Sequence, residues 1–142
     1  MSPEATADVI HRVTYSETDQ MGVAYYGWYT VWLEKARTEY LRQTGMTYRE
    51  LEAGGLRLAV SEVRIRYRAP ARYDDLVRVR CWVREIASRR VTFGYAVELA
   101  ETGTLLATAE TALLALDQNF NPVRLPNGLR ERLPPSPDPV RI

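Results

Sequence analysis

The chain contrasts one long helical pattern with a series of alternating patterns, and this contrast restricts the folds open to it. Between about Tyr26 and Thr44, apolar residues recur at steps of three and four, which predicts one amphipathic helix. Further along, apolar residues alternate with polar ones, which predicts strands with one apolar face. The alternating apolar residues are Val63, Ile65 and Tyr67, then Val77, Val79, Cys81 and Val83, and then Val91, Phe93, Tyr95, Val97 and Leu99. Residues 104–117 are apolar on both faces and predict a strand covered on both sides.

Shorter signals complete the order of elements. Residues 8–15 predict a first strand, with Val9, Val13 and Tyr15 on one side, and Gly45 is expected to end the long helix. The capping box Thr47–Glu50 predicts a short helix, and a phase change near Ser61 predicts a β-bulge. With one helix for so much sheet, we expect that helix to lie across one face of an antiparallel sheet. The expected organisation is a single domain over 1–142, with a core over 8–133 and a loose proline-rich tail over 134–142.

Composition excludes several classes of function. The 142 residues are 46% apolar and 26% charged with a net charge of +1, so no charge imbalance calls for nucleic acid or an anionic membrane. A face of arginines on two strands prompts a nucleic-acid hypothesis, but nearby glutamates are expected to offset it. These arginines are 64, 66, 68, 78, 80 and 84, and the glutamates are 62, 85, 98 and 110. The single cysteine, the short apolar runs and the absence of a signal-like N-terminus predict a cytoplasmic protein.

The segment from Tyr15 to Arg37 carries the chemistry. Asp19 is expected at the first position of a tight turn that ends at Gly22, just before the long helix. A helix start offers unpaired N–H groups and a partial positive charge. A carboxylate facing such a helix end suits hydrolysis of a carbonyl compound, because the acid attacks or activates water while N–H groups hold the oxyanion. The commoner role of an Asp ahead of a helix is that of a turn or capping residue, and local chemistry alone favours it.

The same segment resembles the signature of the 4-hydroxybenzoyl-CoA thioesterase family, the hot-dog-fold acyl-CoA thioesterases that include the YbgC-like proteins. The matching residues are Tyr15, Asp19, Gly22, Tyr25, Tyr29, Trp32, Glu34, Ala36 and Arg37. A weaker element follows at Tyr67, Pro70, Asp74 or Asp75, and Leu76. The resemblance spans residues 8 to 133. It implies an α+β hot-dog fold, in which a five- to six-stranded antiparallel sheet wraps a long central helix.

The resemblance also implies an activity. It makes Asp19 the nucleophile or general base in hydrolysis of an acyl-CoA thioester, with coenzyme A as part of the substrate and no metal or organic cofactor. YbgC-like members commonly carry His seven residues after the acid, whereas this chain has Tyr26, as the 4-hydroxybenzoyl-CoA thioesterase type does. The backbone N–H of Tyr26 is then the candidate oxyanion donor. The family implies homodimers that often pair into tetramers. Two alternatives stay open, a thioesterase for acyl-carrier-protein substrates and a non-catalytic module that binds acyl-CoA or RNA.

Further candidates line the expected substrate path. Gly27 permits close backbone approach beside Tyr26, and Tyr15 stands where family members often have an aromatic residue near the site. The turn Ser88-Arg89-Arg90 offers a hydroxyl and two guanidinium groups for the phosphates of coenzyme A.

Three other polar residues are expected to have no catalytic or metal-binding role. Glu17 is expected to be a solvated turn residue, and Glu34 to form an ion pair with Arg37. His11 has no cysteine or histidine partner nearby, so no metal site is expected.

Overall fold

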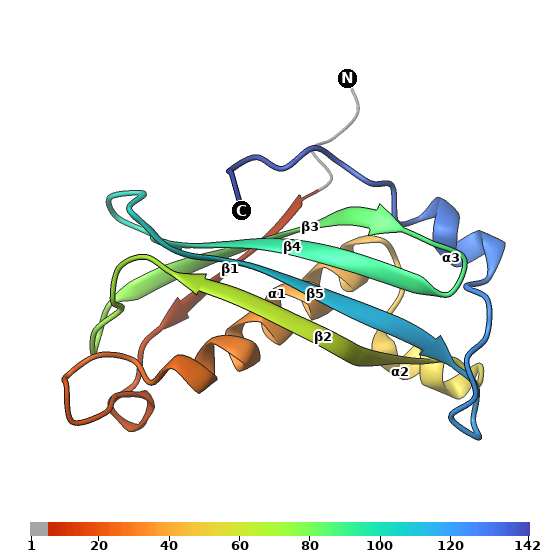
Figure 1. The fold of residues 1–142 in the computed structure, drawn as a ribbon, viewed down its shortest axis with the longest axis horizontal. Coiled ribbons are helices and arrows are strands. Elements are labelled where there is room, and N and C mark those ends of the chain that lie inside the picture. Colours follow the sequence, from red (N-terminus) through yellow and green to blue (C-terminus); the bar gives the residue numbers. More distant parts are fainter. Residues whose placement is uncertain (1–5) are drawn as a thin grey trace.

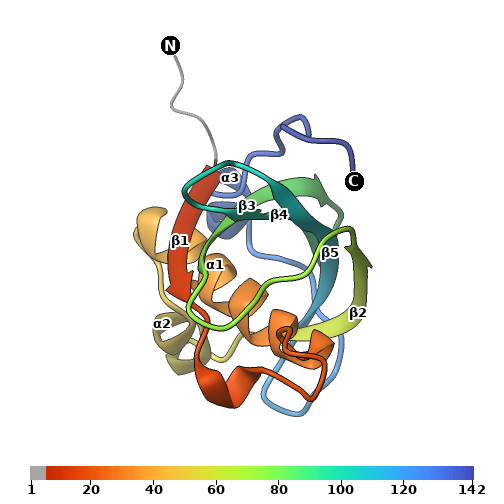
Figure 2. The same cartoon turned by 90° about the vertical axis from the view of Figure 1, so that its left-hand side faces the viewer.

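One sheet and one long helix dominate the structure, a computed structural model that describes residues 6–142. The strands are β1 (Thr6–Arg12), β2 (Arg57–Tyr67), β3 (Leu76–Ile86), β4 (Arg90–Leu99) and β5 (Leu105–Leu116). The helices are α1 (Tyr29–Gln43), α2 (Tyr48–Ala53) and α3 (Asn127–Glu131), and 3-10 turns cover Tyr15–Glu17 and Tyr26–Trp28. The five strands are antiparallel in the order β1-β3-β4-β5-β2. They curl around α1, which lies in the concave face (Figures 1 and 2). The predicted long helix and antiparallel sheet are therefore confirmed, with five strands.

The core lies between α1 and the concave face of the sheet. The side of α1 that faces the sheet buries Trp32, Leu33, Ala36 and Leu41 almost completely. Alternate residues of the strands, such as Val79 and Phe93, meet them from the other side. Complete burial of a large apolar side chain contributes about 1.5–3 kcal/mol, so this interface is the main source of stability.

Local signals in the sequence are found where they were expected. Gly45 has a φ of +89°, and the N–H of Met46 donates to the carbonyl of Leu41 at 3.2 Å, so α1 ends in a glycine cap. The register of β2 against β5 shifts between Val60 and Glu62, which confirms the predicted bulge. In β5, successive residues from Leu106 to Ala109 are buried, as expected for a strand covered on both faces.

Two boundaries differ from the prediction. The first strand ends at Arg12 and does not reach Tyr15, because the chain turns at Thr14 into a 3-10 turn, which leaves Tyr15 77% exposed. Residues 134–142, expected to be loose, are in part attached to β3. The N–H of Ser136 donates to the carbonyl of Val83 at 2.9 Å, and the carboxylate of Asp138 accepts from Trp82 Nε1 at 2.9 Å. Within residues 6–142, no helix has the length and apolar character needed to cross a bilayer.

Candidate active site

Asp19 begins a tight turn, as predicted. The N–H of Gly22 donates to the carbonyl of Asp19 at 2.9 Å, and Gly22 has a φ of +78°, which favours glycine. The N–H of Met21 donates to Asp19 Oδ1 at 2.9 Å, which fixes the orientation of the half-buried carboxyl group. No group within residues 6–142 donates a hydrogen bond to Oδ2 of Asp19. One carboxylate oxygen is thus held by the turn while the other keeps its accepting capacity.

The start of α1 presents free donors. A 3-10 turn over Tyr26–Trp28 leads into the helix, and the N–H groups of Tyr26 and Gly27 meet no acceptor within residues 6–142. The carbonyl of Tyr26 is held from β2, because the hydroxyl of Tyr67 donates to it at 2.8 Å. The first turn of α1 contains no acidic residue, so the partial positive charge of this helix end is not neutralised from within the helix.

Asp19 and the start of α1 line one cavity. This cavity has a volume of about 320 Å³, and Tyr29, Tyr67 and Pro70 also form part of its wall. Gly27 lies beside it, and a Cβ atom there would come within 3.0 Å of the Tyr25 ring, so the absence of a side chain permits the aromatic packing next to the site. The structure therefore brings together Asp19 and Tyr26 from the predicted set, whereas Gly27 follows Tyr26 in the chain but does not line the cavity. A thioester carbonyl placed between a carboxylate and free N–H groups is the arrangement needed for acyl transfer to water.

Other predicted substrate-binding residues lie elsewhere in the single chain. Ser88, Arg89 and Arg90 are on the hairpin between β3 and β4, whereas the Asp19 loop lies beside the opposite end of β3, where Val13 N–H donates to the carbonyl of Asp75 at 2.9 Å. An eleven-residue strand is about 35 Å long, so one chain does not bring the two groups together (Figure 1). Tyr15 packs edge-on against Tyr73, with ring centroids 5.7 Å apart, and does not line the cavity.

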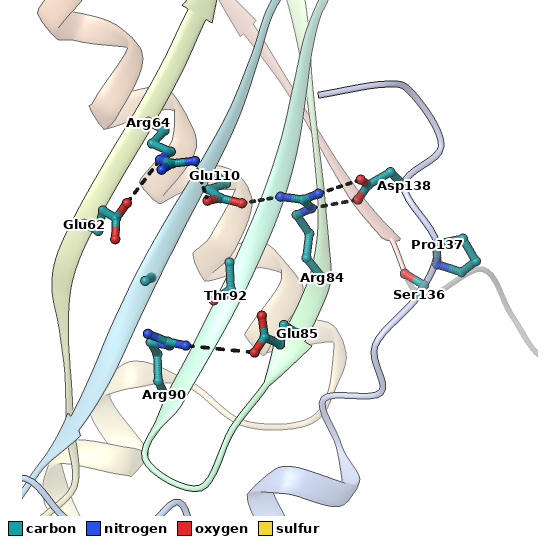
Figure 3. A pocket seen from close by; sticks show the side chains of 11 residues that line it. Glu62, Arg64, Arg84, Glu85, Arg90, Thr92, Glu110, Ser136, Pro137 and Asp138 are labelled. Carbon is teal, nitrogen blue, oxygen red and sulfur yellow. Dashed lines mark hydrogen bonds and ion pairs between the residues drawn. The ribbon is translucent and has the colours of Figure 1, made fainter.

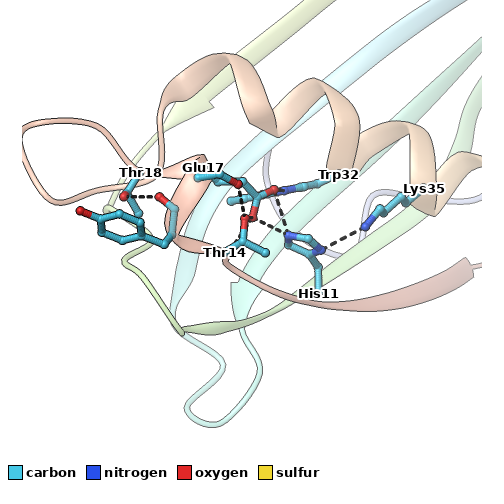
Figure 4. Close-up of polar contacts among 8 residues, drawn as sticks. His11, Thr14, Glu17, Thr18, Trp32 and Lys35 are labelled. Carbon is cyan, nitrogen blue, oxygen red and sulfur yellow. Dashed lines mark hydrogen bonds and ion pairs between the residues drawn. The ribbon is translucent and has the colours of Figure 1, made fainter.

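Glu17 is not a solvated turn residue, and this prediction is wrong. Its side chain is buried and accepts hydrogen bonds from the N–H of Thr14 at 2.7 Å, the hydroxyl of Thr14 at 3.0 Å and Trp32 Nε1 at 2.8 Å (Figure 4). His11 Nε2 lies 2.9 Å from Oε1 and 3.1 Å from Oε2. Burial raises the pKa of the Glu17 carboxyl group, but the hydrogen bonds from Thr14, Trp32 and His11 outweigh burial and lower it from 4.5 to about 2.

His11 connects Glu17 to a cation. Lys35 Nζ lies 3.1 Å from His11 Nδ1 (Figure 4). An ammonium group can only donate, so Nδ1 accepts and the imidazole proton sits on Nε2, which donates to Glu17. Within residues 6–142, no three His, Cys, Asp or Glu side chains gather in a group that would hold a metal ion.

Arg37 is also held differently from the prediction. It forms no ion pair with Glu34 within residues 6–142. Its buried guanidinium instead donates to the hydroxyl of Tyr48 at 2.8 Å and to that of Tyr95 at 3.1 Å. Burial opposes its charge, but the phenolic oxygens outweigh burial and raise the pKa of Arg37 above its ordinary value. Cys81 is fully buried, as expected of a core residue, and burial raises the pKa of its thiol far above the ordinary value.

Several arginines on the convex face of the sheet are paired with acids. A polar cavity of about 520 Å³ lies there. In it, Glu110 lies between Arg84 and Arg64 (Figure 3). Arg84 also pairs with Asp138 at 2.9 Å. The other ion pairs are Arg64 with Glu62 at 3.1 Å, Arg80 with Glu98 at 3.7 Å and Arg90 with Glu85 at 3.9 Å. The expected offset by glutamates is therefore confirmed for Arg64, Arg80 and Arg84, whereas Arg66, Arg68 and Arg78 form no ion pair within residues 6–142.

Comparisons with known proteins agree on the fold and the family. A family model described as the thioesterase-like superfamily matches residues 13–133. The acyl-CoA thioester hydrolase YbgC of Escherichia coli is 32% identical over 119 residues, which are 83% of this chain and 88% of that protein. A hypothetical protein, TT1821, from Thermus thermophilus has a TM-score of 0.84 at 37% identity, over 89% of this chain and 96% of that one. A DHNA-CoA thioesterase from Staphylococcus aureus has a TM-score of 0.85 at 30% identity, over 89% and 87% of the two chains.

Proposed function

The chain belongs to the thioesterase-like superfamily and is a thioester hydrolase, and on this premise we propose that it hydrolyses an acyl-CoA thioester to the free acid and coenzyme A. In this proposal Asp19 is the nucleophile or general base, and the N–H of Tyr26 is the oxyanion donor. The names of the relatives support coenzyme A as the thiol, since the YbgC protein is an acyl-CoA thioester hydrolase and the staphylococcal structure is a DHNA-CoA thioesterase.

The observation that carries the proposal is the shared cavity. Asp19 and Tyr26 line the same space of about 320 Å³, and Asp19 Oδ2 and the Tyr26 N–H both lack partners within residues 6–142. A free carboxylate oxygen can take a proton from water or attack a carbonyl carbon. A free N–H at a helix start can stabilise the negative charge that develops on the carbonyl oxygen.

Two routes use this geometry. As a general base, Asp19 removes a proton from water, the water oxygen bonds to the acyl carbon, and the C–S bond breaks as the oxyanion collapses. The proton on Asp19 then neutralises the departing thiolate. As a nucleophile, Asp19 bonds to the acyl carbon and releases the thiolate, and water then cleaves the mixed anhydride. A thiolate leaves without strong acid assistance because the pKa of its thiol is near 8.5. This leaving group suits a site whose cavity is lined by no histidine. Neither route assigns a step to a metal or an organic cofactor. That the enzyme requires neither of them stays a prediction.

We further propose that the working enzyme is at least a homodimer. Among residues 6–142, strand β2 is an edge of the sheet with no strand on its outer side, and its Val60, Val63 and Tyr67 are each more than 40% exposed. Antiparallel pairing of two β2 strands would extend the sheet and bring the partner subunit's β3–β4 hairpin to the end that carries Asp19. That arrangement gives Arg89 and Arg90 a route to the phosphates of coenzyme A. Sedimentation analysis of the purified protein measures the state directly, and a monomer would contradict this part.

The Asp19→Asn variant tests the chemistry. Amide replacement preserves the size of the side chain but removes its basicity and nucleophilicity, so kcat is expected to fall by about 10²–10⁴-fold. Release of thiol is measured with a panel of aryl and short- to medium-chain acyl-CoAs, and with the same acyl groups on a carrier protein. Asp138→Asn, which makes the same change outside the cavity that contains Asp19, is the control and retains kcat.

Equal thiol release by wild type and Asp19→Asn would contradict the role of Asp19. Turnover of carrier-protein thioesters with none of the acyl-CoAs would contradict coenzyme A as the thiol and favour the carrier-protein alternative.

A further inference from the structure

The buried carboxylate of Glu17 joins three elements that surround the Asp19 loop. It accepts from His11 on β1, from Thr14 where the chain turns after β1, and from Trp32 on α1 (Figure 4). His11 lies six residues before Glu17 and Trp32 fifteen residues after it, so Glu17 holds β1, the following turn and α1 together. Its side chain does not line the cavity that contains Asp19. Its position is therefore behind the site and not within it.

The backbone of Glu17 contacts both ends of the candidate site. Its carbonyl accepts the N–H of Tyr25 at 2.7 Å, and Tyr26 is the next residue. Just beyond Glu17, Thr18 and Ala24 form an antiparallel bridge that closes the loop carrying Asp19. Glu17 thus stands one residue before the closed loop and is bonded to the residue that precedes the proposed oxyanion donor. Any shift of Glu17 relative to α1 changes the gap between Asp19 and the Tyr26 N–H.

We propose that Glu17 is a positioning residue, whose buried anion holds the Asp19 loop and the Tyr26 N–H at their catalytic spacing. The inference rests on the proposed function, since it concerns the same two groups. Each partner of the carboxylate is a donor: a backbone N–H, a hydroxyl, an indole N–H and an imidazole N–H. An amide at this position would turn an NH₂ group toward donors, so the site requires the carboxylate and not merely a side chain of its size.

Kinetic comparison of Glu17→Gln with Asp138→Asn tests the inference. The carboxylate of Asp138 also accepts from a tryptophan indole, Trp82 Nε1, at 2.9 Å, but it lies on the convex face of the sheet. Both variants replace a tryptophan-bound carboxylate with an amide, and both are assayed at a temperature where circular dichroism shows them folded. Glu17→Gln is expected to lower kcat by about ten- to a hundredfold with little change in KM, because small displacements of catalytic groups have effects of that size. Asp138→Asn is expected to retain the kcat of wild type.

Folded Glu17→Gln with the kcat of wild type would overturn the inference, as would equal losses of kcat in the two variants. If Glu17→Gln does not fold, Thr14→Val decides. Thr14 is exposed, and the change removes only its hydroxyl, which donates to Glu17 and also lies 3.1 Å from the hydroxyl of the exposed Ser16. A several-fold loss of kcat at unchanged melting temperature supports the inference, and the kcat of wild type refutes it. Asp19→Asn is assayed in the same series. If it is inactive while Glu17→Gln is fully active, only the Glu17 inference fails, and if it is fully active the proposed function fails with it.

Discussion

The hydrogen bonds to Glu17 predict a specific loss of stability in acid. The pKa of this carboxyl group falls from 4.5 to about 2 in the folded protein. At about 1.36 kcal/mol per pKa unit, the ionised carboxylate contributes about 3 kcal/mol to the free energy of unfolding. Because the folded pKa is the lower one, the unfolded state binds the proton first as the pH falls. The contribution is therefore complete above about pH 4.5 and is lost as the pH approaches 2.

Urea unfolding of wild type and Glu17→Gln at a series of pH values between 7 and 2 measures this contribution. Asp138 also has a lowered pKa, and other carboxylates titrate in the same range, so the quantity of interest is the difference between the two proteins. That difference is expected to be about 3 kcal/mol at neutral pH and to shrink steadily below pH 4.5. Since typical domains are stable by about 5–15 kcal/mol, a change of this size is readily measured.

A stability difference that stays constant from pH 7 to pH 2 would refute the reasoning, because it would mean that the charge of Glu17 is not what the hydrogen bonds stabilise. Thr14→Val removes one of the neutral donors and leaves the charge in place. It is expected to show a smaller loss over the same pH range.

Two further substitutions test other contacts. A Cβ atom on Gly94 would lie 2.7 Å from the Trp82 ring, so Gly94→Ala is expected to destabilise the protein by about 1–3 kcal/mol and to lower its melting temperature by several degrees. Gly128 has open space around it, so Gly128→Ala is the control and keeps the melting temperature of wild type. Equal melting temperatures of the two variants would contradict the packing of Trp82 over β4. Tyr67→Phe removes the hydroxyl that donates to the Tyr26 carbonyl. It is expected to lower kcat about fivefold, the equivalent of about 1 kcal/mol, while the melting temperature stays nearly unchanged. An unchanged kcat would show that this hydrogen bond does not hold the helix start.

Features that depend on neighbours in the sequence could be predicted. The end of α1 at Gly45 follows from the left-handed backbone that glycine accepts, and the bulge between Val60 and Glu62 follows from the phase of the apolar pattern. The turn at Asp19 could likewise be assigned, because Asp at its first position and Gly at its fourth are local preferences. The order of the strands in the sheet cannot be predicted in this way, because apolar and polar residues alternate in the same manner whichever strand lies alongside. Only the family resemblance implies that order.

The burial of Glu17 cannot be predicted from local sequence alone, because two of its partners reach it only in the folded chain. Burial of its carboxylate depends on His11 and Trp32, which reach it only once β1 and α1 pack together. A local signal was nevertheless present. Thr14 and Glu17 have the same spacing as the capping box of Thr47 and Glu50, and the N–H of Thr14 does donate to the Glu17 carboxylate. Similarly, Arg89 and Arg90 match a phosphate-binding composition, but the sequence gives no measure of how far the β3–β4 hairpin lies from Asp19.

The burial of Cys81 has a practical consequence for measuring turnover. A colorimetric disulfide reagent that reports free coenzyme A reacts with thiolates, and this sulfhydryl is both shielded from solvent and strongly disfavoured as an anion. The folded enzyme should therefore contribute no background colour, even at the high protein concentrations that slow variants demand. A rise in signal without substrate would then indicate that the sheet has separated from α1 and exposed Cys81.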